Sequence, residues 1–232
     1  MIISSDLPVR VICATRLPKN KFLSHTPTGK SIKIFIETSP VQVRLYDQNT
    51  VGLSELYNRA IAECSESPAI LVFMHDDIYL ADYFWTSRIK KGLENFSIVG
   101  LIGNQRWSPG QASWRFLNAD LECDIMENYS GVVGHGNQFP PQQISNFGSP
   151  GKQCKVIDGL LMAAKSQTLI EANLRFDERF KFDFYDVDFC RSAEEAGLSI
   201  GTIPLTVVHE SPGNFGDSWK ETYKKYIEKW GN

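Results

Sequence analysis

Three features are missing from this sequence: paired cysteines, a dense basic run, and an apolar run long enough to cross a membrane. The five cysteines are scattered, so reduced cytosolic thiols are expected rather than a zinc site or a disulfide framework. With a net charge of -3 and no basic face, nucleic-acid binding is not expected. The first residues lack a charged segment followed by an apolar one, so they do not resemble a signal peptide. These absences predict a soluble, cytoplasmic protein without a transmembrane segment.

The composition that is present suits a folded globular chain. Hydrophobic residues make up 42% and aromatic residues 12% of the 232 positions, which is enough for a sizeable core. We find no repeats and no low-complexity segments. The length suits one domain, so residues 1–232 are expected to fold together.

Strand and helix patterns alternate over the first hundred residues. Strands are expected at 9–16, 32–39, 41–47, 70–74 and 97–103, and helices at 53–66 and 82–96. This alternation predicts an α/β fold with a mostly parallel sheet flanked by helices on both faces.

The second half of the chain is harder to assign. Residues 104–155 are rich in Gly, Pro, Asn, Gln and Trp, a composition that suggests long functional loops. Beyond them we expect a strand entering a helix at 156–165, a helix at 186–196 that ends at Gly197, and a last strand at 202–211. A capping box from Ser218 to Glu221 predicts the start of a terminal helix.

Two short motifs resemble nucleotide-binding loops but do not fit them. TPTGKS (26–31) has the end of a P-loop, but the position of its first glycine, residue 24, is serine. A P-loop also needs a helix after its lysine, whereas a strand is expected here. GVVGHG (131–136) is out of order for a dinucleotide fingerprint.

A buried strand is expected to end in three polar residues. In LVFMHDDIYL (71–80), the apolar run stops at His75, Asp76 and Asp77. Ligands of open α/β sheets bind beyond the carboxyl ends of the strands, and carboxylates there suit a hard divalent cation. The alternative is a solvated turn in which aspartate acts as a helix cap.

Two further acidic or imidazole-bearing positions fall where elements begin or end. In FDERFKFDFYDVDFCR (176–191), Asp186 and Asp188 lie at the expected start of a helix, where capping is one role. A partly desolvated carboxylate working near neutral pH is the other. His209 ends the strand of VVHES (207–211) as His75 ends its own, although an isolated histidine at a strand end is usually structural or merely exposed. Convergence of these positions on one sheet edge indicates a common site.

Together these segments resemble glycosyltransferase family 2 and its relatives of the GT-A fold. The resemblance is greatest to the bacterial glycosyltransferase-like branch, in which His-x-Asp replaces Asp-x-Asp. Four segments match in order: NTVGLSELYNRAI (49–61), LVFMHDDIYL (71–80), FDERFKFDFYDVDFCRSAEEAG (176–197) and VVHES (207–211). At His75 and Tyr185 the chain departs from the family, which usually has Asp and Glu there.

The resemblance implies roles for particular residues. A divalent cation, Mn²⁺ or Mg²⁺, would be held by Asp77, His209 and Asp76, and Asp186 would be the catalytic base. The nucleotide-sugar contacts would be Thr15, Glu37, Asn58, His75 and Asp76. The acceptor contacts would be Trp107, Trp114, Asp158, Gly159 and Tyr185. The rings of Trp107, Trp114 and Phe116 would either stack on acceptor sugars or pack in the core or a lid.

The implied function is that of a metal-dependent, inverting glycosyltransferase. It would move a sugar from a nucleoside-diphosphate donor, UDP-linked, to a glycan or lipid-linked acceptor in surface polysaccharide assembly, at the inner face of the membrane. Residues of about 1–103 would form the half that binds the nucleotide sugar, and residues of about 104–232 the half that binds the acceptor and carries out catalysis. A nucleotidyltransferase is an alternative, although CATRLPKNK (13–21) lacks the glycines of its usual signature. An inactive GT-A-like domain that only binds glycan or a protein is another. The sequence does not specify an oligomeric state.

Overall fold

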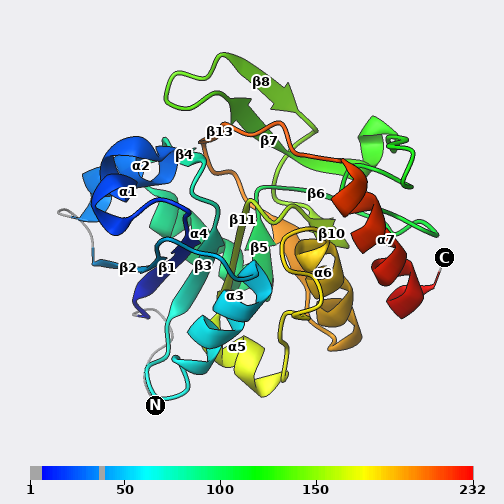
Figure 1. Cartoon of the computed structure of the whole chain (residues 1–232), viewed down its shortest axis with the longest axis horizontal. Coiled ribbons are helices and arrows are strands. Elements are labelled where there is room, and N and C mark those ends of the chain that lie inside the picture. Colours follow the sequence, from blue (N-terminus) through cyan, green and yellow to red (C-terminus); the bar gives the residue numbers. More distant parts are fainter. Residues whose placement is uncertain (1–6, 37–39, 232) are drawn as a thin grey trace.

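The computed structural model describes residues 7–36 and 40–231, which form an α/β fold with two sheets (Figure 1). The strands are β1 (Val9–Ala14), β2 (Val41–Tyr46), β3 (Ile70–Met74), β4 (Ile78–Leu80), β5 (Ile98–Gly100), β6 (Ile102–Asn104), β7 (Tyr129–His135), β8 (Gln143–Asn146), β9 (Gln153–Cys154), β10 (Val156–Ile157), β11 (Leu161–Lys165), β12 (Ile200–Thr202) and β13 (Val207–His209). The helices are α1 (Lys19–His25), α2 (Pro27–Ile36), α3 (Leu53–Ala62), α4 (Trp85–Asn95), α5 (Ser166–Glu171), α6 (Tyr185–Glu195), α7 (Asp217–Trp230) and a 3₁₀ turn (Met126–Asn128). No helix in these ranges is long and apolar enough to cross a membrane.

The main sheet has seven strands in the order β2-β1-β3-β11-β5-β12-β9. Strands β2, β1 and β3 are parallel, as are β5 and β12, but β11 runs antiparallel to both β3 and β5. The sheet is therefore mixed, and the expectation of a mostly parallel sheet was too strong. The reason is that β11 follows the irregular middle of the chain and has no helical crossover before it, which a parallel connection requires.

A smaller sheet has the order β10-β6-β7-β13-β4, with β8 paired to β7. In Figure 1, β4, β13, β7 and β8 lie above the main sheet. The chain passes from the main to the smaller sheet between β3 and β4 and again between β5 and β6. The candidate site therefore lies where the two sheets meet, at the end of fully buried strand β3.

One expected strand is a helix. Residues 32–36, predicted to begin a strand, form the end of α2. The alternation in IKIFI suggested period two, but Ile32 and Phe35, three residues apart, are the buried positions. A Cβ at Gly29 would lie 2.0 Å from the Phe22 carbonyl oxygen, so only glycine allows α1 and α2 to pack this closely. GKS therefore lies within a helix, and our reason for rejecting a P-loop from a following strand was wrong; Ser24 still replaces its first glycine.

Several other elements differ in extent from the prediction. The strand expected at 97–103 is divided at Leu101 into β5 and β6. Of the strand expected at 202–211, only residues 207–209 form a strand of their own, β13, and Thr202 is the last residue of β12. Residues 156–165 form β10 and β11, and the helix begins only at 166. Helix α7 starts at Asp217 after Gly216, with no side-chain cap, so the predicted capping box does not form. The predicted positions of β1, β2, α3, β3, α4 and α6 are confirmed.

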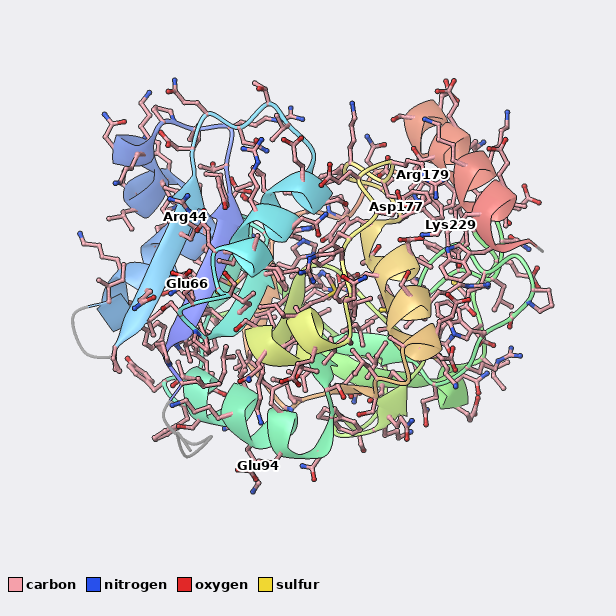
Figure 2. All side chains as sticks on the ribbon, turned by 90° about the horizontal axis from the view of Figure 1, so that it is seen from below. Arg44, Glu66, Glu94, Asp177, Arg179 and Lys229 are labelled. Atoms are coloured by element: carbon pink, nitrogen blue, oxygen red, sulfur yellow. The ribbon has the colours of Figure 1, made fainter. Side chains whose placement is uncertain are left out.

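Helix α7 is fastened to α6 by a buried charge cluster. The Lys229 ammonium donates to Asp188 (2.6 Å) and to Asp177 (2.9 Å), and the Trp230 indole N–H donates to Asp188 (2.8 Å). Arg179 also pairs with Asp177. Figure 2 shows Asp177, Arg179 and Lys229 side by side near α7. Because Asp188 is fully buried, the two donors on its Oδ1 offset part of the cost of burying this carboxylate in α6, whereas Oδ2 has no partner among the described residues.

Candidate active site

The turn after β3 is held by a residue from α2. The Thr28 hydroxyl oxygen lies 2.6 Å from the His75 carbonyl oxygen and 2.8 Å from that of Ile78, and the Thr28 N–H donates to the Asp76 carbonyl (3.1 Å). Thr28 is fully buried, so these contacts are protected from water. The three polar residues of the turn are therefore presented on a fixed backbone.

His75, Asp77 and His209 come together on this backbone. His209 Nε2 lies 3.3 Å from Asp77 Oδ2, and His75 Nδ1 lies 3.9 Å from Asp77 Oδ1. One ligand atom from each of the three residues lies within 4.8 Å of the others. Asp77 Oδ1 and His209 Nε2 are buried and have no hydrogen-bond partner among the described residues. Because buried polar atoms are rarely unpaired, these two atoms fit a metal site.

The charges in this cluster favour metal binding. Burial raises the pKa of Asp77, but the close contact with His209 and the charges of the two imidazoles outweigh it and leave the pKa lowered. Burial lowers the pKa of His75. For His209, burial opposes protonation, but contact with Asp77 outweighs it and raises the pKa. Asp77 is therefore anionic at neutral pH, and a cation would compete with a proton at His209.

Asp76, predicted as a third ligand, faces elsewhere. It lines a cavity of about 800 Å³, which we call the N-terminal cavity, formed by residues 14–17 and 48–53 with Asp76, Lys181 and Phe182. Burial raises the pKa of Asp76, and a hydrogen bond with Thr15 opposes the shift. Thr15 is itself buried and lines the same cavity, and its contact with a donor stays a prediction.

Asp186 lies in the first turn of α6, after Phe184 with its left-handed φ of 65°. Its Oδ2 accepts the Gly159 N–H (2.9 Å) and its Oδ1 accepts the Val187 N–H (2.9 Å). Burial, followed by the charge of Asp158, raises the pKa of Asp186 to about 7 despite these hydrogen bonds. A carboxylate that titrates near neutral pH is suited to accept a proton in catalysis.

A second cavity, of about 300 Å³, contains Asp186 and the metal-ligand cluster. We call it the aromatic cavity, because its walls include Trp114, Phe116, Phe147, Phe215 and Trp219. The Trp114 indole N–H donates to Asp158 Oδ2 (2.5 Å), and the other Asp158 oxygen accepts the Leu160 N–H (2.8 Å). Trp114 and Asp158, both predicted acceptor contacts, thus line the cavity, and each Asp158 oxygen accepts one hydrogen bond within the protein.

Comparison with known proteins identifies the family. A model described as the glycosyltransferase like family matches residues 44–230, more than half of the chain. The chain belongs to this family. It is a glycosyltransferase by family and has the GT-A fold. No curated protein matches its sequence.

Two solved structures are similar to this glycosyltransferase. GalNAc-T7 with UDP, GalNAc and Mn²⁺ is 10% identical, with a TM-score of 0.54, over 96% of this chain and 48% of that one. The chain thus spans about half the length of that neighbour. The catalytic domain of Drosophila β1,4-galactosyltransferase 7 in complex with xylobiose is 9% identical, with a TM-score of 0.49, over 94% of this chain and 80% of that one. At this identity, the first likeness supports the fold alone.

Other predicted site residues of the glycosyltransferase lie away from the two cavities. The Asn58 side chain bonds the Phe176 backbone in both directions (2.9 Å each) and contacts Glu178, so it braces the FDE segment. Trp107 donates to Glu194 (2.6 Å) and stacks against Arg191, outside the lining of both cavities. Glu37 lies outside the described residues.

Sequence reasoning missed several residues that line the cavities. Lys181 and the exposed Phe182 line the N-terminal cavity, and Phe182 also lines the aromatic cavity. Both belong to the FDERFKFDF run, whose alternating aromatic and charged residues were a usable signal. His135, at the end of β7, lines the aromatic cavity and bonds Ser145 (2.8 Å). It lies in the segment 104–155, which gave no strand signal that would have placed it.

Proposed function

We propose that the chain transfers a sugar from a nucleoside diphosphate donor, UDP-linked, to a hydroxyl of a glycan or lipid-linked acceptor, with inversion, in surface polysaccharide assembly. The observation that carries this proposal is the division of adjacent carboxylates between two cavities. Asp76 faces the N-terminal cavity, whereas Asp77 faces the aromatic cavity with Asp186. A donor in one cavity would thereby have its reacting end beside an acceptor in the other.

The N-terminal cavity suits the donor. Its volume of about 800 Å³ lies within the range typical of sites for cofactor-sized ligands. Thr15 and Asp76 supply hydrogen-bonding groups for a ribose and base, and the Lys181 ammonium supplies a charge for phosphate oxygens. The neighbouring glycine, Gly52, would place a Cβ 2.9 Å from Lys181, so the two chain segments can approach only without a side chain there.

His75, Asp77 and His209 would hold the divalent cation. A bound cation neutralises the negative charge that develops on a diphosphate leaving group. Two imidazoles and one carboxylate are a less oxygen-rich set than Mg²⁺ or Ca²⁺ prefers, so we expect Mn²⁺ or a later first-row metal to bind more tightly than Mg²⁺. The ligand set therefore supports Mn²⁺ over Mg²⁺.

Asp186 would act as the base. Its pKa of about 7 allows it to accept the proton of an acceptor hydroxyl as that oxygen attacks the anomeric carbon. Direct attack inverts the anomeric configuration. A retaining mechanism would instead need a second carboxylate as nucleophile and a covalent intermediate, so a product of inverted configuration is the expected outcome.

The acceptor would lie in the aromatic cavity. Its rings offer flat apolar faces for sugar C–H groups, and the adjacent polar atoms of His135 and Asp158 can orient hydroxyls. A lipid-linked acceptor would bring the reaction to the cytoplasmic face of a membrane, with the protein associated peripherally.

The test is a panel of nucleotide sugars with and without Mn²⁺. We expect one UDP-sugar to raise the melting temperature in the presence of Mn²⁺, and free UDP to be released when acceptor is added. The Asp186→Asn variant should keep the thermal shift and lose UDP release. Absence of stabilisation by any nucleotide or nucleotide sugar would refute the donor assignment. Binding without release by the unaltered protein would favour an inactive, ligand-binding domain.

A further inference from the structure

Tyr185 connects the metal-ligand cluster to the candidate base. Tyr185 is the first residue of α6, directly before Asp186, and its side chain is buried. Its hydroxyl oxygen lies 2.8 Å from the Gly159 carbonyl oxygen and 2.7 Å from His75 Nε2. The N–H of the same Gly159 donates to Asp186. One glycine thus contacts both neighbouring residues of α6, through its carbonyl and its amide.

The number of available hydrogens fixes which group donates in each of these two hydrogen bonds. A tyrosine hydroxyl has one hydrogen, and a carbonyl oxygen can only accept, so Tyr185 donates to Gly159. The hydroxyl must then accept from His75, which places the imidazole proton on Nε2. The remaining nitrogen, Nδ1, carries a lone pair and lies on the side of Asp77, 3.9 Å from Oδ1. This is the nitrogen that the metal-ligand cluster requires.

The ring of His75 is held on its face as well. Phe182 stacks on it with a centroid distance of 5.9 Å and an interplanar angle of 21°. The backbone N–H of His75 donates to the Leu160 carbonyl (3.1 Å), which fixes the start of the side chain. His75 is therefore held by its backbone N–H, by the Nε2 edge of its ring and by one ring face, and its Nδ1 edge is directed at the cluster.

The position of Gly159 depends on having no side chain. A Cβ there would lie 2.2 Å from the Tyr185 hydroxyl oxygen and 2.9 Å from Asp186 Cβ. A methyl group would thus displace both the residue that orients His75 and the candidate base. This close approach shows that the contact between Gly159 and α6 is a tightly packed one rather than a loose surface contact.

We propose that Tyr185 is a positioning residue that holds His75 in its Nε2-protonated tautomer and presents Nδ1 to a divalent cation shared with Asp77 and His209. Through Gly159 it ties this ligand to Asp186, so that the cation site and the base keep a fixed relation. The inference rests on the metal site of the proposed function, but it requires neither a particular sugar nor turnover.

The first experiment measures Mn²⁺ affinity by titration calorimetry in the absence of nucleotide. Tyr185→Phe keeps the ring and its packing against Phe176, and removes only the hydroxyl. Outer-shell partners of histidine ligands are worth about 10–100-fold in affinity, so we expect a weakening in that range. Tyr226→Phe is the matched control, because this buried tyrosine stacks on Phe184, next to Tyr185 in sequence, but its hydroxyl contacts neither His75 nor Gly159. It should leave the Mn²⁺ affinity unchanged.

A double-mutant cycle separates positioning from a general structural effect. In a His75→Ala background, Tyr185→Phe should cause no further loss of Mn²⁺ affinity, because the hydroxyl then has no ligand to orient. An undiminished additional loss would show that Tyr185 acts otherwise, and would overturn the proposal. Melting temperatures of all variants, measured in EDTA, check that each is folded.

The second experiment observes the tautomer directly in the metal-free protein. The chain has only four histidines, so ¹⁵N-histidine spectra with the His75→Ala variant as reference will identify the His75 ring. We expect its proton on Nε2. A proton on Nδ1, or wild-type Mn²⁺ affinity in Tyr185→Phe, overturns the inference. If the wild type transfers sugar but Tyr185→Phe binds Mn²⁺ as tightly as the wild type, only this inference is rejected. If Mn²⁺ binding depends on Tyr185 but the protein binds no nucleotide sugar, only the proposed function is rejected.

Discussion

Replacing Asp186 by asparagine should abolish turnover and stabilise the protein in a pH-dependent way. The carboxyl has a pKa of about 7 in the folded chain, against 3.8 as the ordinary value, because it is buried beside Asp158. The folded state therefore binds this proton more tightly than the unfolded state. Between about pH 4 and about pH 7, unfolding releases the proton, and wild-type stability falls by about 1.4 kcal/mol per pH unit from this group.

Asparagine does not titrate, so the free energy of unfolding of the variant does not fall with pH through this residue. Its advantage over the wild type should grow by about 3 kcal/mol between about pH 5 and about pH 8, and then remain constant. For a chain of this length, that corresponds to a melting-temperature difference that widens by about 5–10 °C. Turnover should fall at least about 100-fold, because a positioned general base contributes that much or more.

The assay is thermal and urea unfolding of both proteins in EDTA across this pH range. Glu221→Gln is the control, because it makes the same change from carboxylate to amide at an exposed position on α7. Parallel pH profiles for the wild type and Asp186→Asn would show that Asp186 has an ordinary pKa and would refute its assignment as a desolvated base.

Four further outcomes follow from the geometry. Turnover of the wild type should rise with pH and level off above about 7 as Asp186 loses its proton, which a pH–rate profile will show. Asp77→Asn should weaken Mn²⁺ binding at least about 10-fold in calorimetry, and the wild type should bind Mn²⁺ more tightly than Mg²⁺. Lys181→Met should raise the KM for the donor about 10-fold through a lost phosphate contact, whereas Lys220→Met on exposed α7 should leave it unchanged. Trp114→Phe should raise the acceptor KM more than the donor KM, measured by varying each substrate separately.

Much of the fold was readable because burial and periodicity agreed. Strand β3 is apolar at every position and central in its sheet, and α3 has its apolar residues on one face. The failure at α2 has a physical cause: five residues of IKIFI fit both periods, and the packing of Gly29 on α1 decides for the helix. Such a contact between helices is not visible in a local pattern.

The sequence indicated which residues lie near the candidate site, but not which of them group together. His75, Asp77, Asp186 and His209 all lie around the aromatic cavity, as their places at element ends suggested. The structure groups His75 rather than Asp76 with the other ligands, because alternate residues of the turn face different cavities. Sequence spacing gives the order of residues along a turn but not which side of it each one faces.

The place of β11 in the main sheet bears on how such enzymes could be recombined. This strand, from residues 161–165, lies between β3 and β5, both of which come from the first 103 residues. Exchanging the second half of the chain with that of a relative would replace the strand that pairs with both β3 and β5 by one from another sequence. A chimera designed to accept a new acceptor should therefore retain β11 and graft only the loops around it.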